Sequence, residues 1–355
     1  MNDGLRTVTY QAKLGTVADK VARVAALAEA IAAQVGVAPA LARRAAELSK
    51  ADLQSRLVNE FPDLQGIAGR YYAAVENEPV EVANAIDEAY MPRFAGDAVA
   101  PSKLGQVLAI AERLDTLAGG FAAGLKPTGN KDPFALRRNA LGLARVLVEG
   151  NLHLSLYYAL LKAREMQAVP ISEEASPVAA LELVGFVYDR LRSYYEDRGF
   201  SMAQFEAVRA MDASIQDDPD DLVDFDARLK AIGEFARLPE ADALAAANKR
   251  IRNILKKAEG AIPATVDPAL FTEAAERELA AAVDAACAET DTALQQRDYV
   301  AVLGRLARLR PQVDAFFDAV MVNVEDDAVR NNRLALLQRL ADRLGSVAAI
   351  EHLSA

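Results

Sequence analysis

Residues Val17–Val35 read VADKVARVAALAEAIAAQV, and this stretch decides the fold class. Its apolar side chains recur at three- and four-residue spacing, as one face of a helix requires, and Gly36 follows at the expected C-terminal cap. Similar periodicity returns along most of the chain, and no segment alternates strictly as a half-buried strand does. The sequence therefore predicts an all-α protein.

Composition agrees with a folded, helical chain. Of 355 residues, 52% are hydrophobic and 26% are charged, which are ordinary values for a globular protein. Aromatic residues reach only 6% and Trp is absent, so Ala and Leu carry most of the apolar content and favour helices over strands. Because the length exceeds what one hydrophobic core usually serves, we expect two domains.

The helical pattern is interrupted by segments that contain Pro and Gly. A helix is expected over 39–60 with Asp52 inside it, and another starts after Ser102 and carries Asp115. Residues 169–177 form a polar connector without periodicity, so we place a first domain at 1–168 and a second at 178–355. Helices of the second domain are expected at 178–198, 202–211, 222–237, 238–257, 268–295, 299–317 and 326–343.

The residues that are scarce exclude several kinds of site. Cys287 is the single cysteine and cannot form an intramolecular disulfide, so a reducing cytoplasm is expected. His153 and His352 lie far apart, which argues against a histidine metal site or a Ser–His triad; we expect no metal. No segment approaches the roughly 20 apolar residues of a membrane span, and residues 1–10 lack a signal-peptide core. No membrane contact is expected.

The net charge of −11 argues against nucleic acid, but it is only an average. Cations concentrate at 249–257 and 305–310, while acids gather at 217–221. The segment 245–257 places Lys249, Arg252 and Lys256 off its apolar stripe and so predicts a basic helix face. Such a face suits RNA phosphates, and its Asn residues suit base edges; the alternative is an ordinary solvated face.

Three further features carry weaker signals. Asn331, Asn332 and Arg333 follow the acidic start of the last helix and offer either ligand contacts or interhelix hydrogen bonds. The turn 129–131 precedes a helix as a phosphate-binding loop does, but it lacks the strand and the Lys-Ser/Thr pair of a Walker motif. Asp52 and Asp115 would form a hydrolytic pair only if they faced one another and further metal ligands were present.

Several long strings in the chain resemble one family, the bacterial heterotetrameric glycyl-tRNA synthetase β subunit, in its C-terminal half. The resemblance covers nearly the whole chain. In the first domain it rests on Tyr10-Gln-Ala-Lys-Leu-Gly15, Glu60-Phe-Pro-Asp-Leu-Gln-Gly66, Pro92-Arg-Phe-Ala-Gly-Asp97 and Pro127-Thr-Gly-Asn-Lys-Asp-Pro-Phe-Ala-Leu-Arg-Arg138. In the second it rests on Ala247-Asn-Lys-Arg250, Asn253-Ile-Leu-Lys-Lys257, Val320-Met-Val-Asn-Val-Glu325 and Arg330-Asn-Asn-Arg-Leu334.

The resemblance implies an HD-like helical domain followed by a helical-bundle anticodon-binding domain like that of arginyl-tRNA synthetase. It implies a non-catalytic role in binding glycine tRNA, while the α subunit, the expected partner in an α2β2 heterotetramer, binds ATP and Mg and aminoacylates. No cofactor is expected on this chain. The tRNA-contact candidates it suggests are Lys249, Arg250, Arg252, Asn253, Lys256, Asn331, Asn332 and Arg333, with Lys131, Arg137 and Arg138 in the first domain.

The chain departs from the family patterns in two ways. HD phosphohydrolases hold metal through a His, a His-Asp pair and a later Asp, whereas this chain has Lys50-Ala51-Asp52 and Asp115 at the corresponding degenerate positions. The family's β subunit is also considerably longer, so the chain is expected to be a truncated or split subunit. Two alternatives stay open: a residual metal phosphohydrolase that uses Asp52 and Asp115, and a subunit-assembly fragment that binds no RNA.

Overall fold

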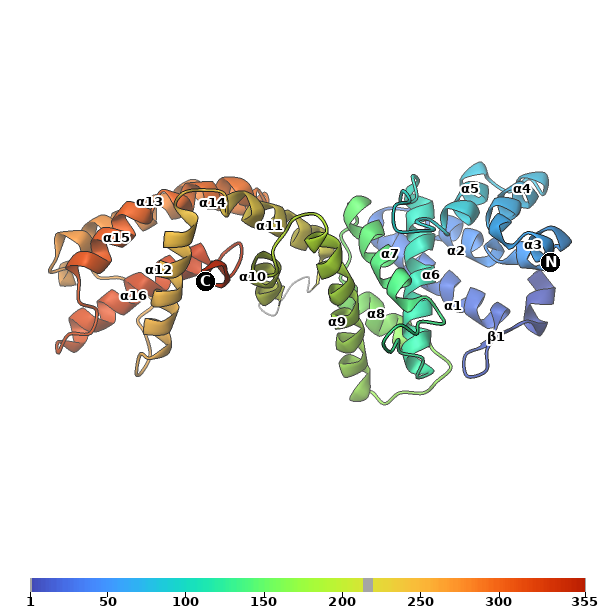
Figure 1. Ribbon diagram of the computed structural model, residues 1–355, viewed down its shortest axis with the longest axis horizontal. Coiled ribbons are helices and arrows are strands. Elements are labelled where there is room, and N and C mark those ends of the chain that lie inside the picture. The colour runs from blue at the N-terminus through green and yellow to red at the C-terminus, as the bar shows by residue number, and fades with distance from the viewer. Residues whose placement is uncertain (1, 213–219, 355) are drawn as a thin grey trace. The chain divides into compact units, whose positions relative to one another are not determined.

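Helices make up nearly all of the regular structure in the computed structural model, which describes residues 2–212 and 220–354 (Figure 1). The all-α prediction is therefore confirmed. The chain divides into two units, Met1–Tyr194 with Asp218–Val223, and Tyr195–Asp217 with Asp224–Ala355. Among the residues described, no helix is both long and apolar enough to cross a membrane.

The first unit is built around α6 (Lys103–Ala122), which is buried on nearly all of its faces. A helix that is buried all round lies at the centre of a domain, and α1, α5, α7 and α8 pack around this one. The helices of this unit are α1 (Val17–Val35), α2 (Pro39–Leu48), α3 (Arg56–Glu60), α4 (Ile67–Val75), α5 (Val80–Glu88), α6, α7 (Leu136–Glu149), α8 (Leu156–Glu165) and most of α9 (Ala175–Glu196). Short 3₁₀ turns are η1 (Asn2–Thr7), η2 (Ala51–Gln54) and η3 (Pro62–Leu64).

Two details of the first unit differ from the prediction. A small antiparallel hairpin pairs β1 (Thr9–Gln11) with β2 (Gly15–Thr16), and these strands are too short for alternation to reveal them. The helix predicted over 39–60 is wrong: it ends at Leu48, and Asp52 lies in η2. The break arises because Asp52 accepts hydrogen bonds from the backbone N–H groups of Gly66 and Gly69, while Ser55 caps α3.

The division between the units falls inside α9, later in the chain than the predicted connector at 169–177. The first part of α9 packs against the first unit, because the Phe186 and Phe121 rings stack edge to face at 5.1 Å and Glu182 pairs with Lys126. From Tyr195 onward, α9 contacts the second unit instead. The Tyr195 hydroxyl donates to Asp226 in α11 (Leu222–Phe235) at 2.6 Å.

The second unit is also a helical bundle. Its core includes fully buried side chains of three helices, among them Ile251, Phe316 and Leu337. The remaining elements of the unit are α10 (Met202–Asp212), α12 (Ala241–Lys256), α13 (Ala274–Gln295), α14 (Tyr299–Ala307), α15 (Arg310–Ala319) and α16 (Asp327–Leu344), with η4 (Pro268–Leu270) and η5 (Ile350–Leu353). The helix predicted over 299–317 is split before Arg310, and Pro311 occupies the first turn of α15.

Candidate nucleic-acid interface

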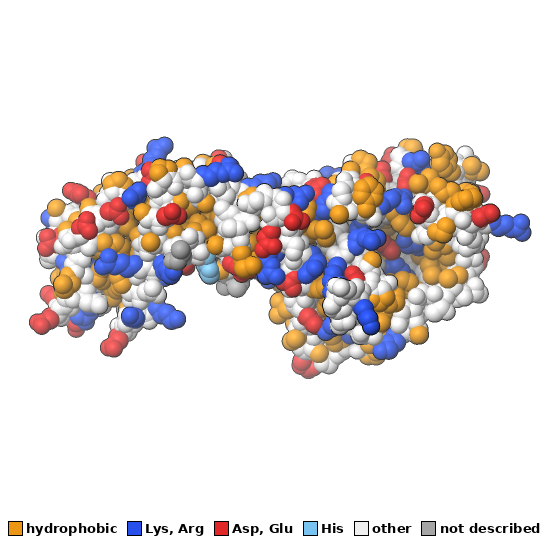
Figure 2. Space-filling model, viewed as in Figure 1, with side chains coloured by type: hydrophobic (Ala, Val, Ile, Leu, Met, Phe, Trp, Pro, Cys, Tyr) orange, Lys and Arg blue, Asp and Glu red, His pale blue; other side chains and the backbone are white. Residues whose placement is uncertain are grey.

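Helix α12 carries the basic segment predicted from the sequence. Its Ala-rich first half has high helix propensity, and Leu244, Ala245 and Ile251 are fully buried against neighbouring elements that include α16 and η5. The other side exposes Lys249, Arg250, Asn253, Lys256 and Lys257. Lys and Arg side chains are visible near the end of this helix in Figure 2. The predicted separation of an apolar stripe from a basic face is confirmed for Lys249 and Lys256, whereas Arg252 is half-buried.

A groove of about 740 Å³ runs along this basic face. The groove combines the positive charge that attracts phosphate with amides that can donate to and accept from a base edge. Glu259 is the one acid that lines it among the residues described. Its polar walls are formed mainly by Lys249, Arg250, Asn253, Lys257, Asn323 and Arg330, and its apolar floor by Ile254 and Leu334.

One cation of the groove is held in place by an aromatic ring. The Arg250 guanidinium lies 4.1 Å from the centroid of the Phe317 ring, which is itself packed edge to face on buried Phe316 at 5.5 Å. A stacked guanidinium keeps its hydrogen-bond donors free at its edge while its face is supported. Arg250 is therefore pre-oriented beside the groove.

Among the cations and amides of the groove, three lie outside the predicted contact set: Lys257, Asn323 and Arg330. Asn323 and Arg330 come from the segment between α15 and α16 and from the first turn of α16, far from α12 in sequence. Arg330 also donates to the Val324 carbonyl and pairs with Asp327. Helical periodicity could not predict that these residues lie beside α12, because their position there depends on tertiary packing.

Three predicted contact residues bond to other elements of the bundle instead. Arg252 donates to the Ala341 carbonyl at 3.0 Å, and Gly345 leaves the space that its guanidinium occupies. Asn332 is 3% exposed and bonds both the N–H and the carbonyl of Asp267, at 2.7 and 3.0 Å. Both side chains join elements of the bundle; Asn332 is buried, whereas the Arg252 side chain remains 37% exposed. Asn331, next to Asn332, is half-buried.

Arg333 is the third of these residues and is buried, at 5% exposure. Its guanidinium donates to Glu276 at 2.9 Å and to the Met321 carbonyl at 2.7 Å. Burial alone would raise the pKa of Glu276, but the hydrogen bond and charge of Arg333 together with the backbone N–H groups of Glu273 and Thr272 outweigh burial, and the pKa is lowered. The pair ties α16 to the start of α13 and is part of the fold.

Asn332→Ala is expected to lower the free energy of unfolding by about 1–3 kcal/mol, because the Asp267 backbone groups lose their buried partners. Chemical denaturation measures this change. Asn331→Ala is the matched control and should stay within about 0.5 kcal/mol of the wild-type chain. Equal effects of the two substitutions would contradict the structural role given to Asn332.

The cations predicted in the first unit lie around the start of α7. Arg137 donates to the Gly129 carbonyl at 2.7 Å, whereas Lys131 and Arg138 are exposed. The backbone N–H groups of Leu136 and Arg137 are taken by the Asp132 carboxylate. Since the helix N-terminus already has its own anion, the turn 129–131 is not arranged as a phosphate-binding loop.

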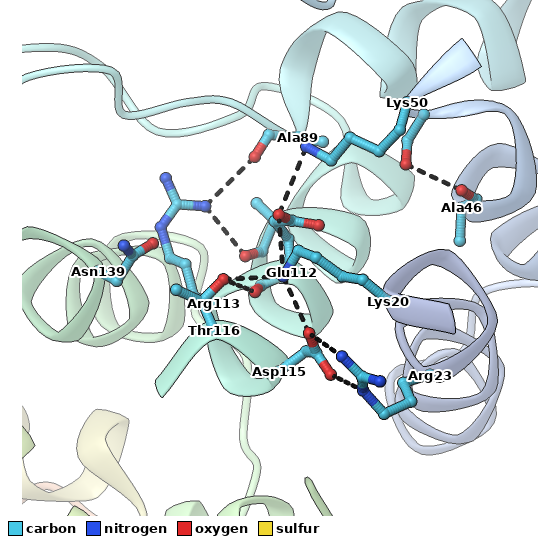
Figure 3. Close-up of polar contacts among 12 residues, drawn as sticks. Lys20, Arg23, Ala46, Lys50, Ala89, Glu112, Arg113, Asp115, Thr116 and Asn139 are labelled. Atoms are coloured by element: carbon cyan, nitrogen blue, oxygen red, sulfur yellow. Dashed lines mark hydrogen bonds and ion pairs between the residues drawn. The ribbon is translucent and has the colours of Figure 1, made fainter. Parts of the chain in front are cut away.

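Asp115 belongs to a buried ion-pair cluster (Figure 3). It is fully buried, and it accepts from Lys20 at 2.9 Å and from Arg23 at 2.6 Å. Lys20 also pairs with Glu112, which in turn pairs with Lys50 at 3.4 Å. Burial alone would raise the pKa of Asp115, but Lys20 and Arg23 hold that pKa below its usual value.

Asp52, the other degenerate HD position, is also fully buried. One carboxylate oxygen accepts from Gly66 and Gly69 N–H at 2.7 and 3.1 Å, and the other has no hydrogen-bond partner among the described residues. Within the described residues no group of three His, Cys, Asp or Glu side chains is placed to hold a metal ion. The two aspartates therefore serve separate structural contacts.

Adding about 1 mM Mn²⁺ is expected to move the thermal midpoint by less than about 1 °C. A site with a dissociation constant of about 10 μM would add about 2.7 kcal/mol of stability under those conditions and shift the midpoint by several degrees. Differential scanning fluorimetry with Mn²⁺ and with chelator measures the difference. A shift abolished by Asp52→Asn would support the phosphohydrolase alternative.

Comparison with known proteins gives two family matches. Residues 1–210 match the model described as glycyl-tRNA synthetase beta subunit, and residues 244–350 match the DALR anticodon binding domain. The second match contains most of α12, nearly all residues that line the groove, and α16.

Individual relatives agree with these matches. The chain is 64% identical over 357 residues to the glycine–tRNA ligase beta subunit of Xanthomonas campestris pv. campestris strain B100, which aligns with all of this chain and half of the relative. It is 55% identical over 381 residues to the beta subunit of Xylella fastidiosa strain 9a5c and 47% identical over 349 residues to that of Pseudomonas aeruginosa strain LESB58. These alignments cover 100% and 98% of this chain and 52% and 50% of the relatives. The chain thus spans about half the length of the curated relatives it matches.

Proposed function

This chain belongs to the glycyl-tRNA synthetase beta-subunit family, and on that basis we propose that it binds glycine tRNA for aminoacylation catalysed elsewhere. The chain corresponds to the C-terminal half of the family's subunit. In this proposal it works in the cytoplasm with the α subunit, in an α2β2 assembly, and the α subunit holds ATP and Mg²⁺. The chain contributes RNA recognition and no catalytic residue.

The observation that carries the proposal is the groove beside α12. Four cations and two Asn amides line it, and Arg250 lies stacked on Phe317 at its edge. Unpaired RNA bases are recognised by stacking and by hydrogen bonds to their edges, while cations contact the adjoining phosphates. Anticodon nucleotides are unpaired and fit this combination.

Charge distribution supports binding through a restricted face. With a net charge of −11, the chain as a whole repels RNA, so attraction has to come from local cations. Lys249, Arg250, Lys256 and Lys257 are all exposed within little more than two turns of α12. We propose these four side chains and Asn253 as the main contacts. Arg252, Asn332 and Arg333 hold that surface in position, and Lys131 and Arg138 remain candidate contacts in the first unit.

A salt-titrated binding isotherm tests the proposal. Glycine tRNA and an unrelated tRNA are titrated against the purified chain between low and moderate salt. About four phosphate contacts predict a slope of log K against log salt near −3, with tighter binding of glycine tRNA. Equal, slope-free binding of the two tRNAs would refute the proposal. No measurable binding of either tRNA would favour the assembly-fragment alternative.

A further inference from the structure

One carboxylate lies among the cations of the groove beside α12. Glu259 is exposed and follows the end of α12 by three residues, where Gly260 turns the chain with a φ of 83°. Four cations line the same groove, yet Glu259 forms no hydrogen bond or ion pair with any other described residue. The Glu259 carboxylate is therefore a hydrogen-bond acceptor that the fold itself does not use.

The position of Glu259 favours neither the helix nor the attraction of phosphate. Negative charge just beyond the C-terminus of a helix is unfavourable, because the last backbone carbonyls carry partial negative charge. In a groove that attracts an RNA backbone, a carboxylate also repels the phosphates. A residue that breaks two such rules without a compensating contact is expected at a functional site. Its position indicates a ligand that donates a hydrogen bond to it.

The other side chains of the groove provide a place for a base beside this carboxylate. Leu334 is buried and Ile254 is half-buried, and together they form an apolar floor on which a ring can lie. The exposed amides of Asn253 and Asn323 also line the groove, and neither forms a side-chain hydrogen bond with another described residue. The groove thus offers two amides and one carboxylate to a base edge, while its cations serve the phosphates.

We propose that Glu259 is a specificity-determining residue whose carboxylate accepts a hydrogen bond from the exocyclic amino group of an anticodon cytosine. This inference rests on the proposed function. Every glycine codon begins with two guanines, so the anticodon of a glycine tRNA contains two cytosines. An ionised carboxylate can only accept, and the N4 amino group of cytosine is a donor that Glu side chains accept from. Uracil carries the acceptor O4 in place of that amino group, so the carboxylate disfavours it.

Binding isotherms with altered tRNAs test the inference. Glycine tRNA and two transcripts, each with one anticodon cytosine replaced by uridine, are titrated against the wild-type chain and Glu259→Gln at one salt concentration. The wild-type chain is expected to bind at least one uridine transcript about tenfold more weakly than glycine tRNA. In Glu259→Gln this ratio should fall to within about twofold of one, because an amide can accept from N4 or donate to O4. The ratio is the readout because the lost charge affects all three RNAs alike.

Glu278→Gln is the matched control, because Glu278 is exposed on α13 outside the groove and the substitution removes the same charge. This control should keep the wild-type preference for cytosine. An unchanged preference in Glu259→Gln would overturn the inference, as would equal binding of all three RNAs by the wild-type chain; in both cases tRNA binding itself would stand. Failure of the wild-type chain to bind any of the three RNAs would overturn the proposed function and this inference with it.

Discussion

Asp115→Ala is expected to lower the stability of the first unit by about 3–5 kcal/mol, the largest effect of any single substitution considered for this chain. The reason is that the substitution leaves Lys20 and Arg23 buried without their shared carboxylate. The Lys20 and Arg23 residues are 4% and 8% exposed, so water cannot replace the lost partner at low cost. The Gln167 amide, which also donates to Asp115 at 3.1 Å, loses an acceptor as well.

Hydrogen exchange of α1 and α6 amides, followed by mass spectrometry, localises this loss of stability to the first unit. Glu29→Ala is the matched control: it also removes one carboxylate from an Arg pair, but Glu29 and Arg43 each have 42% exposed side chains. Exposed pairs contribute at most about 1 kcal/mol. Effects of similar size from Asp115→Ala and Glu29→Ala would show that the cluster does not stabilise the fold in the way its geometry indicates.

The ion-pair cluster of Asp115 also makes the stability of the first unit depend on pH in a predictable direction. The pKa of Asp115 is lowered in the folded chain, so its contribution is full above the unfolded value of about 3.9 and is lost as pH falls through the folded pKa. Burial alone would lower the pKa of Lys20, but the charges of Asp115 and Glu112 raise it. The stability that Lys20 contributes is therefore full below its unfolded pKa of about 10.4 and is lost as pH rises through the folded pKa. The stability gap between wild type and Asp115→Ala should therefore be flat near neutral pH and narrow in strong acid.

Local sequence patterns were sufficient for most of the fold. Apolar spacing and caps predict α1 and α6, because the positions of the apolar residues within each helix indicate which face is buried. The same patterns failed at Asp52, where a carboxylate bonds backbone groups more than ten residues away and ends a helix that propensity would continue. Long-range hydrogen bonds of this kind have no local signature.

The candidate site could likewise be predicted only in part from the sequence. The basic face of α12 follows from residue spacing alone, and Lys249, Arg250 and Lys256 are exposed as expected. Which arginine remains exposed could not be predicted, since this depends on tertiary packing: Arg252 meets the Ala341 carbonyl of α16, whereas Arg250 stacks on the Phe317 ring. The contribution of Asn323 to the groove likewise depends on how α12 and the segment before α16 pack together.

Lys249→Ala/Arg250→Ala/Lys256→Ala is expected to weaken binding of glycine tRNA by about 10²–10³-fold at low salt and to reduce the salt slope by about 2–3. All three side chains are exposed, so the fold should be unaffected. Salt-titrated isotherms measure both quantities. Lys230→Ala/Arg237→Ala/Arg277→Ala is the matched control, because it removes the same charge from other exposed positions of the second unit.

The control separates local contact from overall charge. If attraction to RNA were a property of net charge, both triple variants would weaken binding and flatten the salt dependence equally, and the α12 assignment would fail. Arg252→Ala distinguishes a structural role from a phosphate contact. Because the Arg252 guanidinium donates to the Ala341 carbonyl, this substitution should lower the stability of the fold and leave the salt slope of tRNA binding near the wild-type value. A slope reduced by about one in folded Arg252→Ala would instead place Arg252 among the phosphate contacts.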